Sequence, residues 1–140
     1  MKMIIIIPQI RYLGISGITL FPLVILRDKD LKQDKRILNH ERIHIRQQVE
    51  LLVLPFYLLY LIEFGIGLIK YRNRQTAYIN ISFELEAHKN DENLNYLSER
   101  KLWAWRKYMW NKKFFTIRWK VQKPPFRNCS FRILFLKHNF

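Results

Sequence analysis

The chain has 140 residues, a mass of 17.3 kDa and a formal net charge of +14, and 49% of its residues are hydrophobic. This apolar content supports one buried core and excludes wholesale disorder, while the single cysteine excludes an intrachain disulfide and any zinc module built on several cysteines. Residues 100–140 hold 12 Lys/Arg and no acid, whereas residues 1–99 hold 13 Lys/Arg and all 11 acids. Residues 1–99 are therefore close to neutral, and we expect one domain over residues 1–110 and a basic, aromatic tail over residues 111–140.

Two short strands are expected near the start of the chain. Residues 3–7 are an apolar run that Pro8 ends, and residues 18–27 are rich in β-branched side chains, with Pro22 indicating a sheet edge or a bulge. The first run is shorter than the roughly 7 to 15 apolar residues of a secretion signal. We therefore expect a cytoplasmic protein, or one bound peripherally at the inner face of a membrane.

A helix is predicted over residues 34–54. Asp34 is a suitable N-cap, Leu38, Ile45 and Val49 fall on one helical stripe, and Pro55 should stop or kink the helix. Residues 77–90 support two interpretations, because apolar residues alternate there as in a strand while the residue types at the end favour a helix. A further amphipathic helix is expected over residues 92–110, and a basic β-hairpin is conceivable over residues 115–122.

The predicted first helix contains the motif HExxH, as His40-Glu41-Arg42-Ile43-His44. The spacing places two imidazoles one turn apart on one helix face, where both reach the same ion, and Glu41 beside it without ligating it. Zinc held by two imidazoles and a carboxylate keeps an open position for water, and Glu41 would take the proton of that water during attack on a carbonyl. The alternative is an incidental histidine pair on a solvated helix face.

A third ligand is needed, and the chain offers Glu50, Glu63, Glu84, Glu86 and His88. The order of HExxH, a long apolar segment and then Glu84-Leu85-Glu86-Ala87-His88 resembles the gluzincin metallopeptidases. The membrane-linked kinds are the most similar, namely the CAAX prenyl protease type and the antibiotic-sensing signal transducers. Small bacterial proteins that carry the same two motifs are similar too. The resemblance covers residues 39–90 and implies that His40, His44 and Glu84 bind Zn2+ and that Glu41 is the general base.

The resemblance departs from the family pattern at His88, which stands where the family usually has an Asp that holds a ligating histidine. If residues 77–90 are helical, Glu84 and His88 share a face and Glu86 points about 200° away, whereas a strand would put all three on one face. Glu84 is therefore the expected ligand, with Glu86 in reserve and otherwise an exposed partner of Lys89 or Arg74. Candidates for oxyanion stabilisation are Tyr78, Arg42 and His88.

Residues 51–69 are almost wholly apolar and, at 1.5 Å per residue, give roughly 28 Å of helix, just enough for one membrane crossing. One crossing would put His44 and Glu84 on opposite sides of the bilayer, so a single span and this metal site exclude each other. We predict instead a pair of helices broken near Gly65 and Gly67 that covers the metal-binding helix, buried or lying at a membrane interface.

The sequence thus predicts a small, mostly helical α+β domain of zincin-like type, with an N-terminal strand pair packed on the HExxH helix. Its function would be zinc-dependent hydrolysis of peptide bonds in a peptide or protein substrate. The competing interpretation is a non-catalytic protein that binds an anionic membrane surface or nucleic acid through residues 100–140, where tryptophans alternate with Lys and Arg. Of these two partners we favour the membrane surface, and a third interpretation is an inactive relative that keeps zinc for structure alone.

Overall fold

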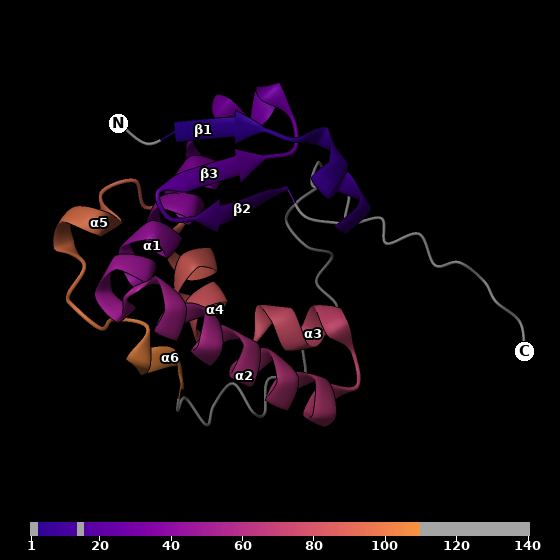
Figure 1. Ribbon diagram of the computed structural model, residues 1–140. Coiled ribbons are helices and arrows are strands. Elements are labelled where there is room, and N and C mark those ends of the chain that lie inside the picture. The colour runs from indigo at the N-terminus through magenta and orange to yellow at the C-terminus, as the bar shows by residue number, and fades with distance from the viewer. Residues whose placement is uncertain (1–2, 14–15, 110–140) are drawn as a thin grey trace, which may run out of the picture.

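The computed structural model describes residues 3–13 and 16–109. Strands β1 (Met3–Ile6), β2 (Gly17–Leu20) and β3 (Leu23–Leu26) form one sheet in the order β1-β3-β2, in which β1 runs parallel and β2 antiparallel to β3. Figure 1 shows this sheet at the top of the molecule, above the helices. The described part is therefore α+β and mostly helical, as the sequence predicts.

The expected strand over residues 18–27 is in fact a hairpin of β2 and β3. Its turn is Phe21-Pro22, whose peptide bond is cis. Proline lacks the N–H that a central strand position needs, so it stands in the turn instead of at an edge or bulge of one longer strand. Short 3-10 helices, η1 (Pro8–Leu13) and η2 (Lys29–Lys32), follow β1 and β3.

Helix α1 (Lys35–Leu51) carries the HExxH motif and begins where the sequence predicts. The Asp34 side chain accepts hydrogen bonds from the backbone N–H of Arg36 and Ile37, which satisfies two donors that the first turn leaves open. The helix ends at Leu51, the following residue Leu52 has a φ of +61°, and α2 (Val53–Tyr71) starts directly afterwards. Pro55 therefore lies in the first turn of α2, where its missing N–H costs no hydrogen bond.

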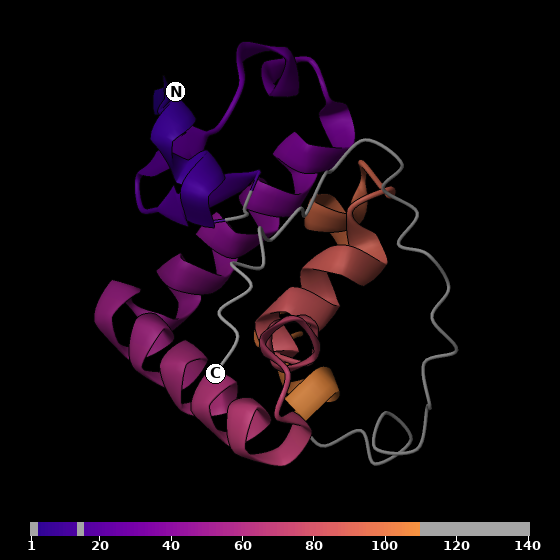
Figure 2. The same ribbon diagram turned by 90° about the vertical axis from the view of Figure 1, so that its right-hand side faces the viewer.

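Helix α2 corrects one prediction, because it runs unbroken through Gly65 and Gly67. Gly67 instead allows close packing on α3 (Arg74–Ile79), since a Cβ at this position would lie 3.0 Å from the Cβ of Ala77. Figure 2 shows α2 as the outer edge of the helical layer. Only Phe56 and Gly67 of this helix are buried, so the expectation of a buried helix pair is also wrong, and α2 is the one described helix long and apolar enough to cross a membrane.

The ambiguous segment 77–90 is helical, which excludes the strand alternative. It comprises the end of α3 and all of α4 (Ser82–Asn90), and α4 lies behind α1 and α2 as they are seen in Figure 1 (Figure 2). The long helix expected over residues 92–110 is replaced by two single-turn helices, α5 (Tyr96–Glu99) and α6 (Arg106–Met109). Trp103 between them has φ +60°, a left-handed conformation that a continuous helix excludes. The conceivable hairpin at 115–122 and the basic tail lie outside the described residues.

Two apolar clusters hold these elements together on either side of α1. One joins β3 to α1 through Val24, Leu26 and Ile45, and the other joins α2, α4 and the segment before α6 through Phe56, Phe83 and Trp105. The buried members of both clusters are at most 8% exposed, and because apolar interiors are close-packed, the polar side chains that α1 and α4 turn toward each other are held at fixed positions between them.

Candidate metal centre

The two histidines of the HExxH motif point their outer ring nitrogens at the same place. On α1 the Nε2 atoms of His40 and His44 are 3.0 Å apart, and the ring planes are nearly perpendicular. One helical turn separates the two residues, so their side chains emerge from the same face of α1, and that face is turned toward α4. The histidine pair is therefore not on a solvated helix face.

Glu84 on α4 completes a cluster of three. Its carboxylate oxygens lie 3.5 Å from His40 Nε2 and 3.4 Å from His44 Nε2, and its side chain is buried. Tyr60 on α2 donates a hydrogen bond of 2.8 Å to Oε1. Among the described residues, nothing donates a hydrogen bond to Oε2, although a buried carboxylate oxygen without a donor is costly.

The spacing of these three side chains is close to that of a tetrahedral site. Zinc lies about 2.0 to 2.2 Å from imidazole nitrogen and carboxylate oxygen, so two ligand atoms of a tetrahedral site lie about 3.3 to 3.5 Å apart. The two Nε2 atoms are 3.0 Å apart, His44 Nε2 lies 3.4 Å from Oε1 of Glu84, and His40 Nε2 lies 3.5 Å from Oε2. Oε2 of Glu84 receives no hydrogen bond from the described part of the chain, and a cation would satisfy it. The residues present therefore fit a metal held by two imidazoles and one carboxylate.

Gln47 fixes the orientation of the His44 ring. Its side-chain carbonyl lies 2.8 Å from His44 Nδ1, and because a carbonyl only accepts, Nδ1 carries the proton and Nε2 keeps its lone pair for a metal. The amide nitrogen of Gln47 donates in turn to the Glu86 carboxylate at 3.0 Å and to the backbone carbonyl of Phe83 at 3.2 Å. The tautomer that a metal ligand needs is therefore built into the packing.

Glu86 is not the reserve ligand, and it is not an exposed partner of Lys89 or Arg74. It is fully buried and bound by the guanidinium group of Arg100, which also bonds Glu50. The remaining candidate, Glu63, accepts hydrogen bonds from the backbone N–H and hydroxyl of Ser82. Of the carboxylates that the sequence offered, only Glu84 lies with the histidine pair among the described residues.

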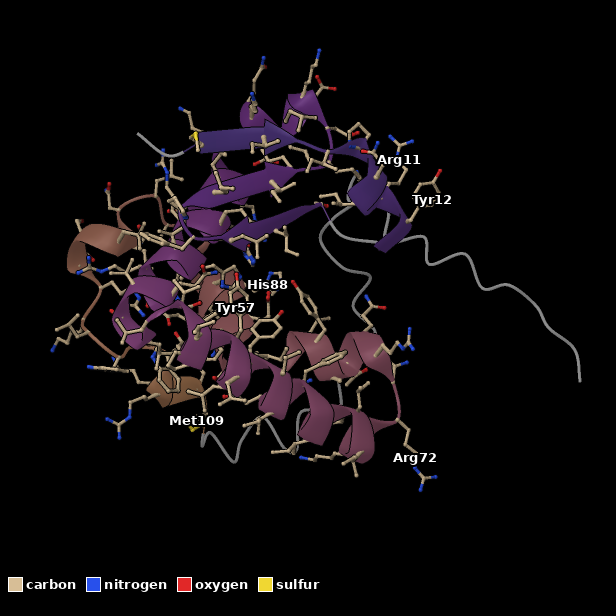
Figure 3. All side chains as sticks on the ribbon, in the orientation of Figure 1. Arg11, Tyr12, Tyr57, Arg72, His88 and Met109 are labelled. Atoms are coloured by element: carbon tan, nitrogen blue, oxygen red, sulfur yellow. The ribbon has the colours of Figure 1, made fainter. Side chains whose placement is uncertain are left out.

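Asp91 takes the position that the sequence analysis assigned to His88. Its carboxylate lies 3.8 Å from Nδ1 of His40 and 3.8 Å from Nδ1 of His88, and it accepts a hydrogen bond of 2.9 Å from Arg36. The His88 ring packs on the His40 ring, with 4.6 Å between centroids, and its Nε2 lies 3.6 Å from Glu84. His88 therefore lies at the rim of the cluster, in the middle of the molecule between the sheet and α2 (Figure 3).

Glu41, the expected general base, is buried between α1 and β2. Thr19 on β2 donates its hydroxyl to Glu41 Oε2, and a Cβ at Gly17 would lie 2.7 Å from Oε1. Only glycine leaves room for this carboxylate so close to the strand, which explains why the residue occurs here. Glu41 is thus held by the edge strand of the sheet, on the same helix as both histidines.

The charges around the cluster favour a positive charge at its centre. Burial lowers the pKa of His40, but the carboxylates of Asp91 and Glu84 outweigh burial and raise that pKa to about 10. Burial raises the pKa of Glu84, but the neighbouring His44 and His40 outweigh it and hold that pKa well below its usual range. A proton and a metal cation both meet this requirement, and they would compete for the same nitrogens.

Of the candidates for oxyanion stabilisation, Arg42 lies on the exposed side of α1. Tyr78 is partly buried, and the removal of its phenol from water together with the charge of Glu84 raises the pKa of that phenol well above the usual range. Burial and the charge of Glu84 raise the pKa of the Tyr60 phenol in the same way. Both phenols therefore keep their protons beside the Glu84 carboxylate. The sequence thus named one of the two tyrosines that lie at the cluster.

Four residues that shape the centre were not identified from the sequence: Thr19, Gln47, Tyr60 and Asp91. Gln47 carries a usable signal, because it stands three positions after His44 and so shares its helix face. Asp91 stands three positions after His88 in the same way. The other two come from separate elements, and only the tertiary fold brings them to the site. No family model, no curated protein and no solved structure matches the chain.

Proposed function

We propose that the chain is a zinc-dependent metallopeptidase of zincin-like type, in which His40, His44 and Glu84 hold the ion. The observation that carries the proposal is the meeting of these three side chains from α1 and α4, forty positions apart in the chain. The undonated Glu84 oxygen and the tautomer of His44 support it independently. Neither feature is needed for a histidine pair that serves only the packing of the core.

Zinc held by these ligands would supply a water of lowered pKa and would polarise the carbonyl group of the substrate. Glu41 would take the proton of that water on its carboxylate and pass it to the nitrogen of the leaving amine. Thr19 holds the Glu41 carboxylate in one orientation through the hydroxyl bond. Tyr60 binds the other oxygen of Glu84, which keeps the ligating carboxylate from turning.

The first experiment compares the zinc content and peptidase activity of the purified protein with those of His44→Ala and Glu41→Gln. We expect His44→Ala to lose the zinc, and Glu41→Gln to keep it while cleavage of a quenched fluorescent peptide library falls by about 10² to 10⁴-fold. His138→Ala removes a histidine that has no part in the proposal and serves as the matched control. Equal zinc content in the wild type and His44→Ala would contradict the metal site.

The Glu41→Gln variant also separates a catalytic from a purely structural ion. A structural role for zinc predicts that the wild-type protein has no activity for the variant to lose. An activity that survives Glu41→Gln unchanged would contradict the assigned general base while leaving the metal ligands in place.

A further inference from the structure

Helix α2 exposes a continuous stripe of large aliphatic side chains. Six of them are between 48% and 82% exposed: Leu54, Leu58, Leu61, Ile62, Ile66 and Ile69. Their spacing of four, three, one, four and three residues keeps them on one side of the helix, with Gly65 between them. We call these six residues the α2 stripe. It runs along about 22 Å of helix without a polar side chain.

The opposite side of α2 is bound to the rest of the domain by polar contacts. Tyr57 donates to the backbone carbonyl of Thr19 at 2.7 Å, Tyr60 donates to Glu84, and Glu63 accepts from Ser82. These contacts are spaced along the helix and reach β2 and α4. A bilayer that surrounded α2 would have to break them, so α2 cannot span a membrane while this fold is intact.

The charge around the stripe is positive. In residues 51–83 the one acid is Glu63, whose carboxylate accepts hydrogen bonds from Ser82. Lys70, Arg72 and Arg74 are exposed at the far end of α2. No carboxylate of the described residues lies within ion-pair distance of either arginine. Figure 3 shows Arg72 pointing away from the domain. The apolar stripe therefore ends in a group of cations.

We propose that the α2 stripe lies in the surface of an anionic membrane, with the helix axis parallel to the bilayer. An in-plane helix buries its apolar face at the boundary of headgroups and acyl chains and is drawn there by Lys and Arg, which is the pattern found here. A protein partner fits less well, because protein interfaces are enriched in aromatic residues, Met and Arg, and the stripe contains only Leu and Ile. The proposal stands apart from the peptidase, since the metal ligands lie beyond the opposite face of α2.

Co-flotation with lipid vesicles tests this surface. We expect the full chain to float with vesicles of phosphatidylcholine and phosphatidylglycerol, and less with phosphatidylcholine alone. Leu61→Gln/Ile62→Gln should weaken that binding at least about tenfold, because both side chains would otherwise enter the acyl region. The matched control is Met3→Gln/Leu94→Gln, which removes two exposed hydrophobic side chains outside α2 and should leave binding unchanged.

A second variant, Arg72→Glu/Arg74→Glu, should remove the preference for the anionic vesicles. Circular dichroism and zinc content report whether each variant keeps its fold and its metal site. Vesicle binding that is unchanged in Leu61→Gln/Ile62→Gln would overturn the proposal and point to the basic residues 100–140. So would a wild-type dimer that this variant converts to a monomer, because a second copy would then cover the stripe.

Discussion

Gln47 connects the histidine pair to a buried network of charges. One side of its amide accepts from His44, and the other donates to Glu86, which Arg100 binds. An amide that is held from both sides cannot rotate without breaking a hydrogen bond. The orientation of His44 therefore depends on Gln47, which bonds Nδ1 of the ring and leaves Nε2 facing His40 and Glu84.

Replacing Gln47 by leucine should weaken zinc binding by about 10 to 100-fold, because His44 loses the acceptor that fixes its tautomer. Zinc affinity measured by competition with a chelator checks this. The matched control is Gln48→Leu, a neighbour that is equally buried but bonds Thr19 and Phe21 instead of a histidine. If both variants weaken zinc binding equally, the effect belongs to general loss of packing and Gln47 has no special role.

At the scale of elements, the crossing of α2 and α3 depends on one glycine of the two in α2. A Cβ at Gly67 would lie 3.0 Å from the Cβ and 3.1 Å from the Cα of Ala77, whereas a Cβ at Gly65 meets no atom within 4 Å. The two positions have the same helical backbone and differ in what stands beside them.

Gly67→Ala should lower the free energy of unfolding by about 1 to 3 kcal/mol, because α3 must move to admit the methyl group. Gly65→Ala should raise it by up to about 1 kcal/mol, since alanine restricts the unfolded chain and favours a helix. Urea denaturation of both variants measures the difference. Two variants with the same change in stability would show that α2 and α3 are not in close contact.

The first strand and the start of the first helix were predictable from local signals, whereas the hairpin at 17–26 and the bounds of the later helices were not. The Asp34 cap and the apolar runs act over a few residues, so they identify β1 and the start of α1. By contrast, Gly65 and Gly67 suggested a break in α2, because glycine has a low helix propensity. The helix is continuous instead, and Gly67 packs closely on Ala77. Trp103 ended the last predicted helix through a left-handed conformation for which the sequence gives no cue.

At the scale of the whole molecule, Arg100 joins three parts of the chain that are far apart in sequence. It lies between α5 and α6 and donates to Glu50 on α1, at 3.1 Å, and to Glu86 on α4, at 3.2 Å. All three side chains are buried. The two carboxylates are tolerated there only because one guanidinium group neutralises and bonds both.

Arg100→Met should lower the free energy of unfolding by about 3 to 5 kcal/mol, because it leaves two buried carboxylates without a cation. Chemical denaturation measures this loss. Arg106→Met, at an exposed position of α6, is the control and should change stability by less than about 0.5 kcal/mol. A small effect of Arg100→Met would mean that water reaches Glu50 and Glu86 in solution.

The cluster itself was predictable in part, since the HExxH spacing named His40 and His44 and the resemblance to the gluzincins named Glu84, the three residues that the structure brings together. Glu86 stayed in reserve because the choice between the two glutamates depended on whether residues 77–90 are helical. Tyr60 and Thr19 were missed because they approach the cluster from other elements, and no spacing along the chain connects them with it. Asp91 could have been found, because it stands three positions after His88.

The histidines and Glu84 come from helices that the whole α2–α3 excursion separates. An ion shared between them would thus close a loop of forty residues, much as a covalent cross-link does. Such a loop would reduce the conformational entropy of the unfolded chain. The same ion would also hold α2 and α3, and with them the α2 stripe, at a fixed angle to the sheet.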